Sequence, residues 1–231
     1  MQVMQRRTFY GILGIALLVF SNVVSADESE SDIIEEDLKT TMSLIRQNST
    51  TLEEKQFLLR TLNKYAETGI QAAIYQLGLL FSTDRHFKPD IEYANYLLRA
   101  NYEAGHIFSG GFLAINFLNE YMREEENTQL LEDAIALLES LSHLEELVFQ
   151  RYLYQAYFTK GAVVEGEKVL RWCAEQGDLQ SVLELADFLM LKSEIDAAAV
   201  EEAKILYEFL LESNFDVQSI QKRLERIQEI K

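Results

Sequence analysis

The residues that could carry out chemistry in this chain are few and scattered. The three histidines, His86, His106 and His143, have no metal-ligand spacing such as H-E-x-x-H. Cys173 is the only cysteine, so neither a cysteine-based zinc cluster nor an intramolecular disulfide can form. With 38 acidic residues in the chain, a close pair of carboxylates carries no information about acid–base catalysis. We therefore expect no catalytic residue, no metal site and no cofactor, and we predict that the protein is not an enzyme.

Residue types that anchor protein interfaces are instead concentrated in one stretch, residues 149–158. Tyrosine and arginine are enriched among the residues that contribute most of the binding energy at interfaces, and this stretch contains Arg151, Tyr152 and Phe158. We predict a recognition surface that includes side chains of the preceding repeat. Its members are Arg151, Tyr152, Tyr154, Asn116, Asn119 and Glu120.

The elements that would position these side chains follow a repeat. Four similar junctions, AETG, YEAG, AEQG and LESN, end at Gly69, Gly105, Gly177 and Asn214. The intervals between them, counted along the chain, are 36, 72 and 37. Glycine, and next best asparagine, tolerates the left-handed conformation that commonly ends a helix. A fixed period of about 36 residues predicts an all-α solenoid of helix pairs, in which one junction lacks its glycine.

Small residues recur on the helices at matching positions. After each junction a small residue is followed by leucine, a second small residue and a large apolar one, with spacings that place all four on one helix face. This pattern occurs at Ala73, Leu77, Gly78 and Phe81, at Ser109, Leu113, Ala114 and Phe117, and at Ser181, Leu185, Ala186 and Leu189. The helix before each junction has its own small residue, at Ala94, Ala134, Gly166 and Ala203. The successive intervals of 40, 32 and 37 between these small residues indicate an insertion that a deletion then compensates.

Together these motifs, A-x-x-x-L-G-x-x-[YF] followed by A-x-x-[LY] and A-E-x-G, resemble the Sel-one-like repeat (SLR) family of tetratricopeptide-like solenoids. The resemblance covers roughly residues 50–214 and is weakest in the third repeat. It implies a right-handed superhelix of helix pairs, an adaptor or scaffold function, and no shared catalytic residue. The chain departs from the family in the loop Ser82–Pro89, which replaces a glycine-rich loop, and in lacking the cysteines of the disulfide-linked secreted members.

The third repeat leaves two interpretations open. If it follows the second repeat by the interval that separates Ala94 from Ala134, its pattern falls on Phe149, Leu153, Tyr154 and Tyr157, so that aromatic rings occupy both small positions. The rings of a diverged repeat could fill interior space, which is the interpretation we favour for Phe149 and Leu153. Alternatively, rings that rotate outward would contribute to the recognition surface, since this helix is the first of its pair and such helices line the concave face in tetratricopeptide-like solenoids.

Residues 1–26 have the features of a signal peptide. A basic start at Arg6 and Arg7 precedes a short apolar stretch, Phe9–Phe20, which has fewer than the roughly 18 apolar residues that a membrane-spanning helix requires. Small residues at Val23–Ala26 predict cleavage after Ala26 by the Sec pathway and a periplasmic or secreted protein. An uncleaved anchor and a twin-arginine signal are the alternatives that we considered.

The remaining chain divides into three parts. Residues 27–50 contain an acidic start and an N-terminal helix expected over 32–47, after which Thr50 and Glu53 have capping-box spacing. Residues 51–214 form the repeat domain. Residues 215–231 form a capping helix with one apolar stripe, which shields the last repeat. Its members are Val217, Ile220, Leu224 and Ile227.

Charge constrains the partner. The formal net charge is −17, and it becomes −19 once two arginines are removed with residues 1–26. Such a surface disfavours nucleic acid and anionic lipid, and it would attract a basic protein. We therefore expect a protein partner and an interaction scaffold or adaptor. The alternative is an immunity protein that neutralises a secreted toxic effector in the periplasm.

Overall fold

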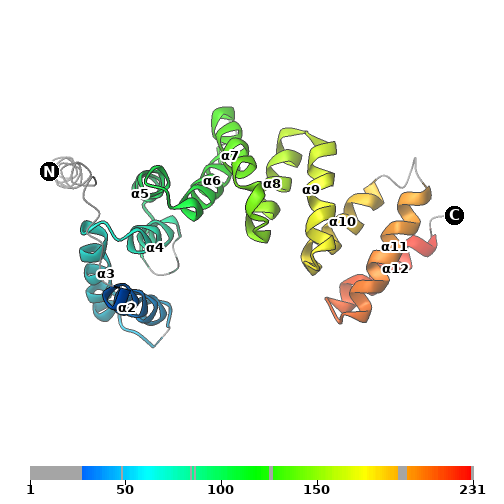
Figure 1. Cartoon of the computed structure of the whole chain (residues 1–231). Coiled ribbons are helices and arrows are strands. Elements are labelled where there is room, and N and C mark those ends of the chain that lie inside the picture. Colours follow the sequence, from blue (N-terminus) through cyan, green and yellow to red (C-terminus); the bar gives the residue numbers. More distant parts are fainter. Residues whose placement is uncertain are drawn as a thin grey trace. The chain divides into compact units, whose positions relative to one another are not determined.

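The computed structural model describes residues 28–47, 49–83, 85, 87–124, 127–191 and 197–229. Within these ranges the chain forms eleven α-helices and one short 3-10 helix, and no strand (Figure 1). The predicted all-α repeat architecture is confirmed. The expected signal peptide, residues 1–26, and His86 lie outside the described residues.

The helices fall into two units, which meet between Asn116 and Phe117, inside helix α6 (Ile107–Tyr121). Helices of repeat proteins contact chiefly their sequence neighbours, so a boundary between units can fall within the predicted repeat domain, residues 51–214. The N-terminal unit holds the first part of α6 together with α2 (Glu28–Arg46), α3 (Leu52–Glu67), α4 (Gln71–Ser82) and α5 (Ile91–Glu103). Helix α4 packs on α3 and α5, and α2 packs on both α3 and α4.

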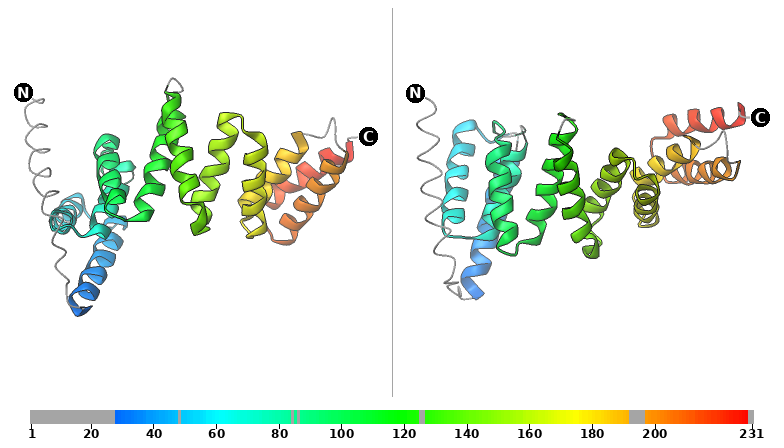
Figure 2. Two further views of the ribbon diagram at one scale, coloured as in Figure 1. Left: turned by 45° about the horizontal axis from the view of Figure 1, so that its top comes forward. Right: turned by 90° about the horizontal axis from the view of Figure 1, so that it is seen from above.

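In the C-terminal unit each helix from α7 onward packs on the next (Figure 2). After the end of α6 come α7 (Thr128–Ser140), the 3-10 helix η2 (Ser142–Leu144), α8 (Leu147–Lys160), α9 (Val163–Glu175), α10 (Leu179–Leu191), α11 (Ala197–Glu212) and α12 (Val217–Glu229). Helix α12 packs on α11, and its stripe residues Ile220 and Ile227 are buried, as expected of a terminal helix that shields the last repeat.

The predicted junctions have the predicted backbone. Gly69, Gly105, Gly177 and Asn214 have φ values of 85°, 97°, 83° and 55°. The junction without a glycine is at Glu145, where φ is 54°. Along the chain, Glu145 follows Gly105 by 40 residues and precedes Gly177 by 32. Ala134 is separated by the same two intervals from Ala94 and Gly166. Glu145 is therefore the missing junction, in the register that the small residues indicated.

The structure also locates the deletion. Helix α4 ends at Ser82 and α5 begins only at Ile91, whereas α8 and α9 are joined by Gly161 and Ala162 alone. Gly161 has a φ of 82°, so its missing side chain permits this tight turn. The sequence pattern did not mark Gly161, because it lies outside the four aligned junctions.

The repeat register is confirmed by burial. The four equivalent leucines, Leu77, Leu113, Leu153 and Leu185, are 1%, 1%, 3% and 3% exposed. The small residues on the preceding helices are also buried, which lets neighbouring backbones approach closely. The register assigned to the third repeat is therefore correct.

Two local predictions at the N-terminal end were wrong. Helix α2 begins at Glu28, ahead of the expected start at Asp32. The capping box before α3 consists of Thr51 and Glu54, one position later than predicted, with the Glu54 carboxylate accepting from the Thr51 backbone at 2.8 Å. Thr50 has the same spacing from Glu53, but its hydroxyl donates instead to the Leu44 carbonyl at the end of α2, at 2.6 Å.

Candidate protein-binding surfaces

Arg151 lies on α8 and faces the start of α10. Its Nε is 3.6 Å from Asp178 Oδ2, and the same carboxylate accepts a hydrogen bond from the backbone N–H of Ser181. Arg151 Nε is itself buried and has no hydrogen-bond partner among the described residues. The side chain is 37% exposed, so Arg151 is partly accessible while its Nε lies near the Asp178 carboxylate just before α10.

Tyr154, by contrast, is an interior residue. It is 1% exposed, and its hydroxyl donates to Glu184 Oε2 on α10 at 2.7 Å. Gln180 donates to the other oxygen of this carboxylate at 3.0 Å. Burial, followed by the bond to Glu184, raises the pKa of Tyr154 to about 12. The side chain therefore joins α8 to α10 and is not part of the accessible surface.

The other predicted surface residues also divide into interior and accessible side chains. Asn116 belongs to the N-terminal unit and is 6% exposed; its amide donates to Ser82 and Asn95, each at 2.8 Å. Asn119 is exposed, whereas Tyr152 and Glu120 are half-buried. The interior position of Asn116 removes it from the surface. The binding role of Arg151, Tyr152, Asn119 and Glu120 stays a prediction.

The rings at the small positions of the third repeat point inward. Phe149 and Tyr154 are both 1% exposed, and they occupy positions held elsewhere by Ala73 and Gly78. The Tyr154 ring makes an edge-on contact with Phe158, with ring centroids 6.2 Å apart. The rings therefore fill interior space, as we favoured for Phe149, and the outward alternative does not hold for Tyr154.

The described histidines form structural contacts. His106 Nδ1 lies 2.9 Å from Ser109 Oγ, and its ring packs against Tyr75 with centroids 4.9 Å apart. Burial lowers the pKa of His106, which favours the neutral ring in this setting. His143 Nδ1 lies 2.9 Å from the Ser140 carbonyl. Over the described part of the chain, no cluster of three or more His, Cys, Asp or Glu side chains is placed to hold a metal ion.

Cys173 is buried in α9 and is 0% exposed. Burial raises the pKa of its thiol to about 12, so the reactive thiolate is scarce at neutral pH. Cys173 is therefore a small apolar residue of the interior. In the part of the chain that the structure describes, no helix is both long and apolar enough to cross a membrane.

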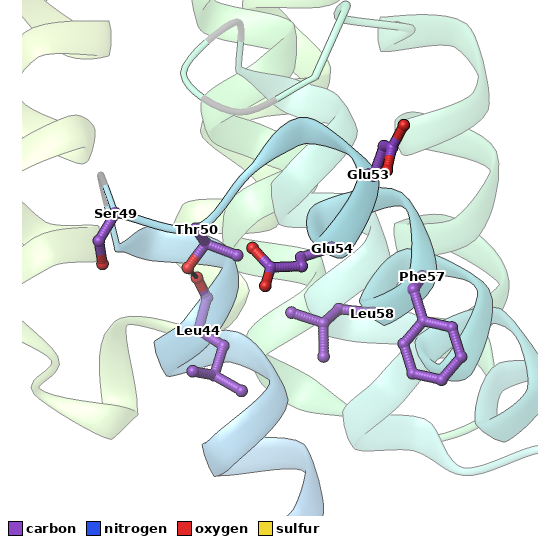
Figure 3. A pocket seen from close by; sticks show the side chains of 7 residues that line it. All are labelled: Leu44, Ser49, Thr50, Glu53, Glu54, Phe57 and Leu58. Atoms are coloured by element: carbon purple, nitrogen blue, oxygen red, sulfur yellow. Dashed lines mark hydrogen bonds between the residues drawn. The ribbon is translucent and has the colours of Figure 1, made fainter.

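A pocket of about 500 Å³ lies where α2 turns into α3 (Figure 3). Leu44 and Leu58 line it, with Phe57 at its edge and Glu53 and Glu54 around it. Phe57 is 62% exposed, although buried phenylalanines are far more common in folded proteins. Sequence reasoning missed this surface; the available signal was that Phe57 does not share the helix face of the buried Leu62.

A larger groove of about 770 Å³ lies between α2 and α4 in the same unit. On the α2 side it is lined by Ile34, Leu38, Met42, Lys39, Ser43 and Arg46, with Gln47 just beyond. On the α4 side it is lined by Ile70, Ala72 and Gln76. This groove was not predictable from sequence patterns, because its two walls are separated along the chain by α3 and none of its lining residues belongs to a repeat motif.

The sequence matches no family model and no curated protein. Comparison of structures finds the crystal structure of a protective antigen present in uropathogenic Escherichia coli strains, which displays an SLR fold. The TM-score is 0.60 at 18% sequence identity, and the match covers 85% of this chain and 41% of the antigen. The chain thus spans about two-fifths of the antigen's length.

The arrangement of helix pairs and this structural match define the class: a helical-repeat protein with the SLR fold. The resemblance that the repeat motifs predicted is confirmed at the level of the fold.

Proposed function

We propose that this protein is an exported scaffold or adaptor that binds a protein partner. The SLR fold supports the proposal, because stacked helix pairs offer extended surfaces suited to binding. The observation that carries it is the accessible apolar surface at the start of α3. Phe57 is 62% exposed and lines the pocket of about 500 Å³, and Leu52, the first residue of α3, is 63% exposed. Exposed apolar patches beside polar residues are typical of interaction sites.

The proposal of export is supported by the signal features of residues 1–26. Sequencing of the N-terminus of the protein from a periplasmic fraction tests it directly. A mature chain that begins at Asp27 supports export, and a chain that retains Arg6 and Arg7 in the cytosolic fraction contradicts it.

Affinity capture with matched variants tests the binding role. Phe57→Ser removes the exposed ring beside the pocket, and Val164→Ser removes a 78% exposed apolar side chain in the other unit as a control. We expect a stoichiometric partner that wild type and Val164→Ser retain and Phe57→Ser loses. Tyr152→Ala and Arg151→Gln examine the α8 surface in the same assay. Equal capture by all variants, or no stoichiometric partner, contradicts the proposal.

The identity of the partner distinguishes the two roles within this proposal. A resident envelope protein supports a scaffold. A secreted toxin, whose activity the protein abolishes in a purified assay, supports the immunity role.

A further inference from the structure

The groove between α2 and α4 has an apolar floor and a polar edge. Leu38 and Met42 form part of the floor and are 5% and 4% exposed, whereas Ala72 on the opposite wall is exposed. The volume of about 770 Å³ lies within the usual range for ligand-binding sites. Both walls belong to the N-terminal unit, so the groove is formed within a single packed body.

The groove carries positive charge at Arg46, although the chain as a whole is acidic. The lining residues that the structure describes include no carboxylate, whereas acidic residues outnumber basic ones by 38 to 21 overall. Lys39 also lines the groove and has an interaction of its own. Arg46 is exposed and forms no ion pair with any described residue. The nearby Asp37 accepts a hydrogen bond from Tyr65 and is not part of the lining. A carboxylate on the ligand would therefore meet the positive charge of Arg46 here, on a chain whose formal net charge is −17.

Gln76 adds a specific polar requirement. Gln76 lines the groove wall, and its Oε1 atom is buried and has no hydrogen-bond partner among the described residues. A buried acceptor without a donor is unfavourable, so a ligand N–H group toward which the Gln76 side chain turns would gain an interaction at this point. Peptide backbone carries such donors at every residue except proline.

From these three features we infer that the groove binds an extended peptide segment of a protein partner in which acidic residues alternate with apolar ones. The apolar side chains contact Leu38 and Met42, a carboxylate lies beside Arg46, and a backbone N–H donates to Gln76. The inference rests on the proposed protein-binding role but concerns a surface separate from the Phe57 pocket. Either surface can therefore fail its test without the other.

Selection from a random dodecapeptide library displayed on phage, with the purified protein as bait, tests the inference. We expect enriched sequences with Asp or Glu within two positions of Leu, Ile, Met or Phe. The most enriched sequence is then synthesised, and its affinity is measured for wild type and variants. Enrichment of basic or purely apolar sequences, or no enrichment, overturns the inference.

Two charge variants give a matched comparison. Arg46→Glu reverses charge in the groove, and Arg60→Glu makes the same change at an exposed position on α3, where the guanidinium lies over the Phe57 ring. We expect Arg46→Glu to weaken the peptide about tenfold or more and Arg60→Glu to leave it nearly unchanged. Equal effects of the two variants would show non-specific attraction and would overturn the proposed site.

A steric variant and a competitor complete the test. Ala72→Trp places a bulky ring in the groove without changing charge, and we expect it to abolish binding while circular dichroism stays that of the wild type. Dodecanoate offers a carboxylate and an apolar chain but no N–H donor, so we expect it to compete weakly. Strong displacement by dodecanoate, with no loss of peptide affinity in Ala72→Trp, would contradict the peptide assignment.

Discussion

The ring of Phe158 lies directly against Gly166, where an added Cβ atom would be 2.8 Å from the ring carbon Cδ1. The equivalent positions in the other repeats are the alanines Ala94, Ala134 and Ala203. Among these equivalent positions only that of Gly166 is a glycine. It lies in the repeat where the two-residue turn at Gly161 and Ala162 joins α8 to α9. The shortened connection and the loss of one methyl group thus occur together.

We expect Gly166→Ala to destabilise the protein by about 1–2 kcal/mol, because overpacking costs about 1–3 kcal/mol and the gain in helix propensity offsets up to about 1 kcal/mol. Urea unfolding measures the change. Combination with Phe158→Leu should recover most of the loss, since the smaller side chain makes room for the methyl group. Additive losses in the double variant would show that the Phe158 ring is not the obstacle.

Truncation of a repeat leucine tests the register of the solenoid. Leu113 is 1% exposed, so Leu113→Ala should lower the free energy of unfolding by about 2–5 kcal/mol through lost burial and a cavity. Leu191 is 83% exposed, and Leu191→Ala serves as the control, with an expected change below about 0.5 kcal/mol. A loss below about 1 kcal/mol for Leu113→Ala would mean that the assigned register is incorrect.

The thiol of Cys173 should be protected by folding. Because Cys173 is fully buried and its pKa is raised to about 12, a thiol reagent at pH 7.5 should label it only after denaturant is added. Mass spectrometry over time follows the labelling. Complete modification of the folded protein within minutes would show that α9 opens readily or is packed differently.

Asp187 on α10 links the last helices and should make stability depend on acid pH. Arg223 Nε donates to Asp187 Oδ1 at 2.7 Å, and the Tyr207 hydroxyl donates to the same oxygen at 2.6 Å. Burial opposes ionisation of Asp187, but the bonds from Arg223 and Tyr207 outweigh it and lower the pKa below its usual 3.8. The stabilising effect is therefore present above about pH 4 and disappears as pH falls through the lowered pKa.

Asp187→Asn tests this dependence. At pH 7 we expect the variant to be less stable than wild type by about 1 kcal/mol, as for a partly exposed charged hydrogen bond. The difference should shrink as the pH is lowered from 5 to 3, because the wild-type carboxyl group becomes protonated. Urea unfolding at each pH provides the comparison, and a difference that stays constant down to pH 3 would rule out this role for the Asp187 carboxylate.

The fold could be predicted from the sequence because the repeat is encoded by local features of the helices and their ends. Gly69, Gly105 and Gly177 mark helix ends through a backbone conformation that glycine favours, and the small residues repeat at fixed distances from them. Glu145 adopts the same left-handed conformation without glycine, so only the spacing on either side reveals it. The choice between Thr50 and Thr51 as the helix cap was not predictable from spacing, since each precedes a glutamate at the same distance.

The candidate sites were predicted less well, because side-chain direction depends on tertiary packing. Tyr154 and Arg151 are typical interface residues by type, yet Tyr154 is buried against Glu184 and Arg151 is engaged by Asp178. Because Asp178 is so close, Arg151→Gln is a cleaner test of binding than a change to glutamate. The exposed Phe57 and the groove beside Arg46 arise from helix packing, which local sequence motifs do not reveal.

Site-specific photo-crosslinking tests the central claim, that this SLR-fold protein binds a protein partner, most directly. The photoreactive residue p-benzoyl-phenylalanine replaces Phe57 in one strain and Val164 in another, and both strains are irradiated under native expression. The account predicts one discrete protein adduct from position 57 that is absent from position 164. No adduct from position 57, or the same adducts from both positions, would contradict it.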